Sequence, residues 1–189
     1  MIRPIPQIGD PVLRQEALPI PPEEVGSSEV QSLIDDLIET MRDANGAGIA
    51  ANQVGVPRRV CVIGVDDNPR YPYKPPIPLT VLVNPTVTVL GDESFASNEG
   101  CLSVPVRGDL RRWAFVEVAA LDRTGEPFVS RFQGLSAGTV QHEVDHLDGR
   151  LIIDRVEDPR SISTWENFDR FHKEAFMAHI STVVDRYHA

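Results

Sequence analysis

Residues 141–149, with the sequence QHEVDHLDG, contain two histidines four positions apart and a glutamate directly after the first. On a helix, residues four apart lie on one face, about 5–6 Å apart at Cβ, so His142 and His146 can bind the same metal ion. Glu143 is rotated by about 100° from His142, which places its carboxylate where a base could act on a bound water. The spacing predicts an incomplete helical metal site, although a solvated polar helix face would show similar residues.

A candidate third ligand lies upstream, in residues 99–105 (EGCLSVP). A thiolate from Cys101 would complete a Cys-His-His set and leave the fourth tetrahedral position open for water, which distinguishes a catalytic from a structural site. Taken alone, Cys101 is equally consistent with a small buried residue in a turn. The other cysteine, Cys61, lies in a β-branched run and is predicted to be a core residue.

Residues 46–53, GAGIAANQ, form a third segment with small residues and one polar side chain. The segment lacks the third glycine and the lysine of nucleotide-binding loops, so phosphate binding is a poor interpretation. Its glycines and alanines favour close approach of the backbone to a ligand, and Gln53 can donate an amide N–H to a carbonyl oxygen. A glutamine at the surface is the alternative for Gln53 alone.

Three helices are predicted to surround these segments. Residues 28–31 resemble a capping box, and apolar residues at helical spacing continue the first helix up to Gly46. Ser136 is expected to cap the helix that carries the histidines, and Gly149 suits a left-handed position at its end. A third helix is predicted from Ser163, again after a capping box.

The middle of the chain predicts strands with period-two or β-branched patterns. They cover residues 60–65, 79–90, 115–121 and 128–132, with a turn at 122–125 between the last two. Residues 66–78 are rich in proline and are expected to form a surface loop. The predicted fold class is α+β, with antiparallel sheets packed round a central metal-binding helix and flanked by N-terminal and C-terminal helices. Residues 1–189 are predicted to form a single catalytic domain, in which residues 161–189 form the C-terminal helix.

Composition limits the classes of partner. The formal net charge of −10 argues against a surface for nucleic acid, so no sequence-specific nucleic-acid partner is expected. Residues 1–6 lack the apolar stretch of a secretory signal, and no stretch approaches the roughly 18 apolar residues of a membrane span. A cytoplasmic protein without a membrane partner is expected, in which metal or core roles for cysteine are favoured over a disulfide.

The patterns GxGxAAxQ, EGCLS and QHExDHLxG, in this order, resemble the peptide deformylase family over roughly residues 1–155. Residues 9–14 are also similar to the start of the family's N-terminal strand. The resemblance implies hydrolysis of the N-formyl group from the N-terminal formylmethionine of newly made polypeptides, with release of formate. It further implies a nascent N-formylmethionyl polypeptide as partner and a transient contact with the ribosome. The charges of residues 161–189 nearly balance, which is not typical of an RNA-binding tail.

The resemblance assigns a role to each candidate residue. Cys101, His142 and His146 are expected to bind one ion, which the family implies is Fe²⁺ with Zn²⁺, Ni²⁺ or Co²⁺ as substitutes, whereas the ligand types alone indicate Zn²⁺. Glu143 is expected to take a proton from the attacking water and return it to the leaving amine. Donors to the tetrahedral oxyanion are expected to be the Gln53 amide and the backbone N–H of Leu102. Six further residues are expected to contact the substrate: Ala47, Gly48, Gly100, Leu135, Gly138 and Thr139.

Several residues distinguish the deformylase interpretation from the alternative functions. A zinc metallopeptidase would use the same helix motif, but its third ligand would be a Glu or His from a later segment. A deformylase-like binding protein without turnover would have no use for Glu143 beside an open metal position. Ala47 stands where bulkier aliphatic residues are common in the family, which predicts a roomier pocket. Ser103, His172 and His179 are interpreted as structural or surface residues.

Overall fold

Two antiparallel sheets and four α-helices make up the fold in the computed structural model, which describes residues 1–66, 70 and 72–187. The larger sheet has the order β1 (Gly48–Ala50), β2 (Val60–Val65), β3 (Ile77–Val89), β6 (Phe115–Leu121), β7 (Pro127–Gln133). The smaller sheet has the order β4 (Ser94–Gly100), β5 (Val106–Trp113), β8 (Ser163–Thr164). The helices are α1 (Ser28–Asp43), α2 (Gly134–Leu147), α3 (Trp165–Phe171) and α4 (Lys173–Tyr187). The predicted α+β class is confirmed.

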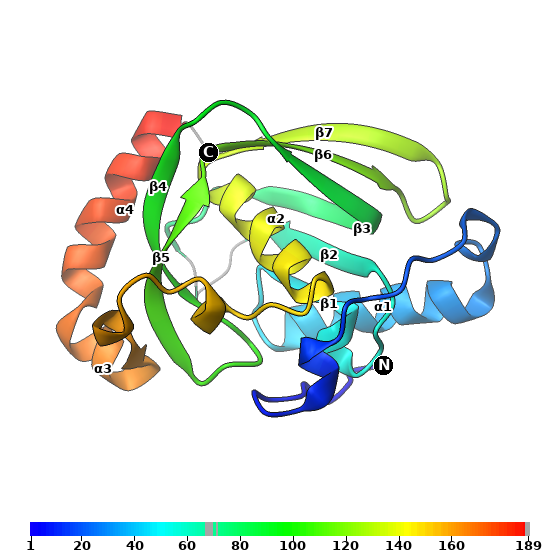
Figure 1. Ribbon diagram of the computed structural model, residues 1–189, viewed down its shortest axis with the longest axis horizontal. Helices are drawn as coiled ribbons and strands as arrows, with labels where there is room; N and C mark the ends of the chain where they lie inside the picture. The colour runs from blue at the N-terminus through cyan, green and yellow to red at the C-terminus, as the bar shows by residue number, and fades with distance from the viewer. Residues whose placement is uncertain (67–69, 71, 188–189) are drawn as a thin grey trace.

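The helix α2 lies between the two sheets, with α1 and α4 on the outside (Figure 1). Ala137, Val140, Val144 and Leu147 recur at helical spacing along α2 and are buried against the larger sheet. Burial of each large apolar side chain is worth roughly 1.5–3 kcal/mol, so this stripe fixes which face of α2 turns away from the larger sheet. The predicted core position of Cys61 is confirmed, since the side chain is fully buried in β2.

The predicted strands of the larger sheet are confirmed with small changes at their ends. β3 begins at Ile77 and includes Pro78, which the proline-rich composition had assigned to the loop. Residues 67–69 and 71 of the predicted loop lie outside the described residues. Asn84 breaks the register of β3 with a φ of 51°, and its side chain bonds both backbone groups of Ile20 at 2.8 and 2.7 Å. This bulge accommodates the proline at position 85.

The strands β4 and β5 were not predicted. Residues 94–100 have the sequence SFASNEG, which is poor in the β-branched residues that favour strands. They are strands because each pairs with the other, from Ser94 opposite Trp113 to Gly100 opposite Arg107. Such pairing is a tertiary effect that local propensity does not encode.

Two helix starts differ from the predicted caps. Ser27, not Ser28, is the N-cap of α1: its backbone is extended and its Oγ accepts a hydrogen bond from the N–H of Val30 at 3.3 Å. The helix α2 begins at Gly134, two residues before the predicted cap Ser136. Gly134 has a φ of 53°, which turns the chain sharply from β7 into the helix. At the other end, Gly149 has the expected left-handed backbone, with a φ of 71°.

We expect Ser27→Ala to lower the free energy of unfolding by about 1 kcal/mol, because the first turn of α1 loses its side-chain acceptor. Ser28→Ala is the matched control and should change it by less than about 0.5 kcal/mol, since Ser28 lies within the helix. Urea unfolding of both variants measures the difference. Equal losses would contradict the assignment of Ser27 as the cap.

The two ends of the chain also correct the sequence analysis. The expected N-terminal strand at residues 9–14 is instead a 3₁₀ helix, Pro11–Arg14, because proline suits its first position and Asp10 caps the N–H of Val12 at 3.0 Å. The predicted single helix from Ser163 is a short strand followed by two helices. His172 breaks the helix with a φ of −122°. This break lets Phe168 and Phe176 pack together, with ring centroids 5.4 Å apart.

Within the described part of the chain, no helix has both the length and the apolarity needed to span a membrane.

Candidate metal centre

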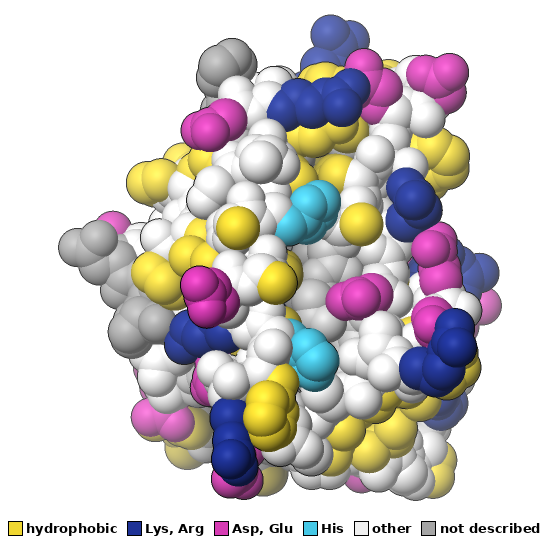
Figure 2. All heavy atoms as spheres, turned by 90° about the vertical axis from the view of Figure 1, so that its left-hand side faces the viewer, with side chains coloured by type: hydrophobic (Ala, Val, Ile, Leu, Met, Phe, Trp, Pro, Cys, Tyr) yellow, Lys and Arg dark blue, Asp and Glu magenta, His cyan; other side chains and the backbone are white. Residues whose placement is uncertain are grey.

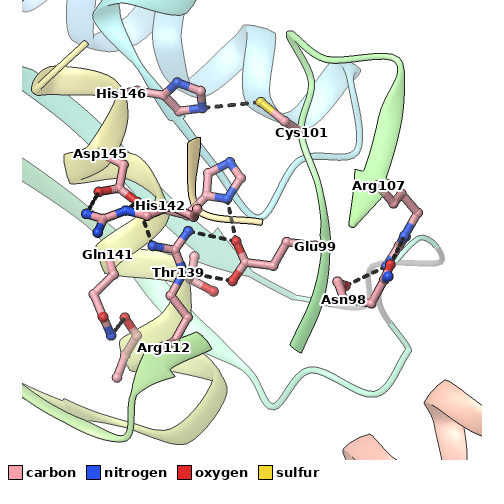
Figure 3. A network of polar contacts seen from close by, with 12 residues as sticks. Asn98, Glu99, Cys101, Arg107, Arg112, Thr139, Gln141, His142, Asp145 and His146 are labelled. Atoms are coloured by element: carbon pink, nitrogen blue, oxygen red, sulfur yellow. Dashed lines mark hydrogen bonds and ion pairs between the residues drawn. The ribbon is translucent and has the colours of Figure 1, made fainter. Parts of the chain in front are cut away.

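Three side chains able to bind one metal ion lie together beside α2. The possible ligand atoms of Cys101, His142 and His146 all lie within 4.8 Å of one another. The Sγ atom of Cys101 is 3.2 Å from Nε2 of His146, and both of these residues are buried (Figure 3). The structure therefore brings together the three residues that the sequence motifs singled out.

Local structure explains how each of the three is positioned. His142 and His146 lie one turn apart on α2, with ring centroids 5.0 Å apart. Cys101 directly follows β4, and the N–H of Ser103 donates to its Sγ at 3.3 Å. Because β4 pairs with β5, the end of β4 is fixed in place, and the thiol that follows it lies beside α2.

Glu99 fixes the orientation of one of the imidazoles. Its Oε2 accepts a hydrogen bond from Nδ1 of His142 at 2.9 Å, which leaves Nε2 of that ring without a proton in the neutral form (Figure 3). Burial by itself would raise the pKa of Glu99, but the Arg112 guanidinium and His142 hold it well below its usual range. A carboxylate that orients a metal-binding imidazole is a recurrent feature of metal sites.

Arg112 joins this carboxylate to the rest of the site. Its guanidinium donates to both oxygens of Glu99 at 3.0 and 2.8 Å, and to Oδ2 of Asp145 at 2.6 Å. The Arg112 side chain is only 3% exposed, and Arg155 donates to the other oxygen of Asp145 at 2.5 Å. A continuous network of ion pairs and hydrogen bonds therefore runs from Arg155 through Asp145, Arg112 and Glu99 to His142.

Sequence reasoning missed the roles of Glu99, Arg112 and Asp145. Glu99 and Asp145 lie inside the recognised motifs, but neither motif shows which charged residue is buried. Arg112 directly follows Arg111, and the two cannot be told apart by residue type. A strand prediction for β5 would have distinguished them, because side chains alternate between the two faces of a strand, so that Arg111 is exposed and Arg112 is buried.

Glu143 lies on the side of α2 that faces β1. A Cβ atom at Gly48 would lie 2.5 Å from Oε1 of Glu143, so only glycine leaves room for this carboxylate. Oε2 of Glu143 is buried and has no hydrogen-bond partner among the described residues. Burial raises the pKa of Glu143 to about 7. The carboxylate therefore lines the same cavity as Cys101 and His142, and one of its oxygens has no hydrogen-bond partner among the described residues.

The Gln53 side chain also lies against the cluster. Its Oε1 accepts the N–H of Ala50 at 3.0 Å, which turns its Nε2 toward Ser103 Oγ at 3.2 Å and Cys101 Sγ at 3.5 Å. Gln53 is buried, so the alternative of a surface glutamine is wrong. Ser103 is fully buried and contacts both Gln53 and Cys101, in agreement with its predicted structural role.

A cavity of about 50 Å³ opens onto these residues. All six predicted substrate-contacting residues line it: Ala47, Gly48, Gly100, Leu135, Gly138 and Thr139. Gln53, Leu102 and Glu143 line it as well. Sequence reasoning missed a wall supplied by Tyr73 and Lys74, from the proline-rich segment. Lys74 donates to Thr139 Oγ1 at 2.8 Å, and burial lowers its pKa to about 8.

The residues present fit a divalent metal ion. One thiol and two imidazoles are borderline to soft donors of the kind that bind Zn²⁺ or Fe²⁺, and they are close enough to share one ion. Three protein ligands leave a coordination position open, and Glu143 has an unpartnered oxygen beside them. This donor set therefore suits a catalytic ion better than a structural one.

We expect the contribution of Glu143 to the stability of the metal-free protein to fall as the pH rises from about 4.5 to about 7. The pKa of Glu143 in the folded state, about 7, is above its usual value of 4.5, so folding favours the protonated form and this contribution disappears as the carboxyl ionises. Glu143→Gln should remove this part of the pH dependence. The measurement is the difference in urea stability between metal-free parent and variant at several pH values; a difference independent of pH would contradict the raised pKa.

An α+β fold that gathers a thiol, two imidazoles and an adjacent carboxyl group at one cavity is typical of the class of metal-dependent hydrolases. Comparison with known proteins narrows the class. Residues 2–161 match the family model described as polypeptide deformylase. The chain belongs to the peptide deformylase family.

Individual relatives agree with this membership. Peptide deformylase 2 from Pseudomonas putida is 43% identical over 160 residues, which covers 84% of this chain and 89% of the relative. A crystal structure of class I type b peptide deformylase from Acinetobacter baumannii aligns with a TM-score of 0.80 and 39% identity, covering 83% of this chain and 99% of that one. The same Acinetobacter enzyme bound to Met-Ala-Ser aligns with a TM-score of 0.79.

Proposed function

We propose that this protein hydrolyses the N-formyl group from the N-terminal formylmethionine of newly made polypeptides and releases formate. The observation that carries the proposal is the Cys-His-His cluster with the unpartnered oxygen of Glu143 beside it, in a chain of the deformylase family. The Met-Ala-Ser bound to the Acinetobacter enzyme has the form of the deformylated product of such a reaction.

Cys101, His142 and His146 would hold one divalent ion, with Glu99 orienting His142. When bound, the ion supplies Lewis acidity and lowers the pKa of a water molecule so that hydroxide is available near neutral pH. Fe²⁺ is the proposed native ion, with Zn²⁺, Ni²⁺ or Co²⁺ as substitutes. The family likeness supports iron, whereas the donor types suit zinc equally well.

Glu143 is the proposed proton carrier. Its free oxygen would accept a proton from the attacking water as the water oxygen adds to the formyl carbon. The same carboxyl would then give the proton to the amine nitrogen as the carbon–nitrogen bond breaks, which leaves formate and a free amino terminus. Gly48 keeps the space that this carboxylate needs.

Gln53 and Leu102 are the proposed donors to the oxyanion. The Gln53 amide is held by Ala50 with its Nε2 toward Cys101, and Leu102 follows the cysteine directly along the cavity wall. Each fixed donor is worth a few kcal/mol in comparable sites. No covalent nucleophile is required, which is consistent with the buried structural position of Ser103.

Ala47→Ile is expected to narrow the selectivity of the enzyme. Ala47 lines the cavity, so its short side chain leaves room for first residues larger than methionine. The variant should keep activity on formylmethionyl peptides and lose about tenfold or more on peptides with a bulkier first side chain, because overpacking a cavity costs roughly 1–3 kcal/mol. The measurement is kcat/KM on a series of formyl peptides. Identical selectivity in parent and variant would contradict the roomier pocket.

The experiment that tests the function is formate release from formyl-Met-Ala-Ser under anaerobic conditions, with metal analysis of the same sample. We expect turnover with near-stoichiometric iron. Full activity in protein that contains only zinc would contradict the choice of iron. Cleavage of unformylated peptides would favour a metallopeptidase, and metal binding without turnover of either substrate would favour a binding protein.

The nascent polypeptide is the proposed partner, which makes the cytoplasm the proposed place of action. All 189 residues are proposed to form one catalytic domain that includes the C-terminal helices. Acidic and basic side chains are interspersed on the face that α3 and α4 cover (Figure 2). This mixture is not typical of an RNA-binding surface, so a transient ribosome contact is proposed from the family likeness alone, and neither a sequence-specific nucleic-acid partner nor a membrane partner is proposed.

A further inference from the structure

We propose that Trp165, in the C-terminal helices, is a positioning residue for the substrate cavity. It lies beyond residues 2–161, the part of the chain that matches the family model. The inference rests on the proposed deformylase function for its kinetic test. In this proposal, α3 and α4 hold two walls of the cavity in place.

The first wall is the end of β4. A Cβ atom at Gly100 would lie 2.2 Å from Cζ2 of Trp165 and 2.7 Å from Cη2, so the indole ring packs directly on the glycine backbone. Gly100 lines the cavity and precedes Cys101, whose Cα is about 3.8 Å further along the chain. The indole therefore supports the backbone that carries the thiol.

Two guanidinium groups hold the indole ring. The Cζ atom of Arg107 lies 4.3 Å from the ring centroid and that of Arg70 lies 4.2 Å from it. Arg107 is buried, and its guanidinium also donates to the side chain and backbone oxygens of Asn98 in β4, both at 2.9 Å (Figure 3). Cation–π contacts at such distances are favourable, and more so when they are desolvated. Trp165 thus joins β4 and β5 to the proline-rich segment.

The second wall is that proline-rich segment. Tyr73 packs edge-on against Phe176 of α4, with centroids 5.1 Å apart, and Phe176 packs against Phe168 of α3. Tyr73 and the adjacent Lys74 line the substrate cavity. A neighbouring hollow of about 340 Å³ is lined by Tyr73, Arg107 and Trp165 together, so the cavity wall and the C-terminal helices are continuous. Tyr73, with Lys74 next to it, is therefore held at the cavity wall by contacts from the C-terminal helices.

Trp165→Ala should raise KM for formyl-Met-Ala-Ser by about tenfold while kcat changes by less than about threefold, because the cavity walls loosen while all three proposed ligands and the proposed base are still present. Trp165→Phe keeps a ring on Gly100 and should restore most of the affinity. Arg70→Gln removes one cation from the indole at a half-buried residue outside the hydrophobic core, and should raise KM by about threefold. Phe171→Ala is the control, since Phe171 belongs to the same helix but is 63% exposed.

Hydrogen exchange gives a second measurement that does not depend on turnover. The amides of Tyr73, Lys74 and Gly100 should exchange faster in Trp165→Ala than in the parent. Their exchange rates should be unchanged in Phe171→Ala. Unaltered KM and unaltered exchange in both Trp165→Ala and Arg70→Gln would overturn the positioning role, even with an active enzyme. A parent protein without deformylase activity would refute the proposed function instead, and exchange alone would then decide the role of Trp165.

Discussion

Glu143→Gln is expected to lower kcat/KM for a formylmethionyl peptide by about 10²–10⁴-fold while the metal content stays unchanged. Glutamine has nearly the same shape as glutamate, so the side chain still fits the space above Gly48. What it loses is the ability to accept a proton from water and return it to the leaving amine. The three proposed ligands are not altered, so metal analysis separates loss of the base from loss of the ion.

Glu126→Gln is a suitable control, because it makes the same chemical change at an exposed residue in the turn before β7. It should retain the activity of the parent. Glu143→Gln protein with its metal bound and with activity within a few fold of the parent would refute the role of Glu143 as proton carrier. Loss of metal along with activity would instead assign the carboxylate a part in binding the ion.

The largest loss of stability is expected from Arg112→Met. Removal of the guanidinium leaves the buried carboxylate of Asp145 and the partly buried carboxylate of Glu99 without the group that lies between them. Breaking a buried ion pair by removing one partner typically costs about 3–5 kcal/mol, because a charge stays buried without compensation. Glu99 would also hold His142 less firmly, so metal affinity should fall by about 10–100-fold.

Arg111→Met is the matched control, one position earlier in β5. Its side chain is 58% exposed and pairs with Glu157, which is 60% exposed, at 3.5 Å. An exposed pair of this kind contributes about 1 kcal/mol or less. Urea unfolding and metal titration of both variants give the comparison. Equal effects of the two substitutions would show that the buried network does not support the metal centre.

The helix with the histidines and all strands of the larger sheet except β1 were predictable because their signals are local. A helix places residues four apart on one face, so the spacing of His142 and His146 already implied that they converge. Apolar runs such as residues 60–65 likewise indicate buried strands by themselves. The caps were less predictable, because adjacent serines such as Ser27 and Ser28 are alike in type and only the backbone at each distinguishes them.

The smaller sheet could not be predicted in the same way. Its strands β4 and β5 are polar, and each is stable because the other completes its hydrogen bonds. The role of Arg112 depends on that pairing, since the alternation of β5 turns it inward and turns Arg111 outward. No local pattern around Gly100 predicts its contact with Trp165. The tryptophan lies far along the chain and contacts the glycine only because of how α3 packs.

The sequence by itself determined the donor types, the base and the family likeness, because these depend on residue identity and on spacing within single segments. Only the tertiary structure decided how close Cys101 comes to the two histidines and which carboxylates are buried with Arg112. It also decided that the C-terminal helices contact the cavity wall. Distances between segments and the desolvation of charges depend on the packing of elements far apart in the chain, and local residue patterns do not specify that packing.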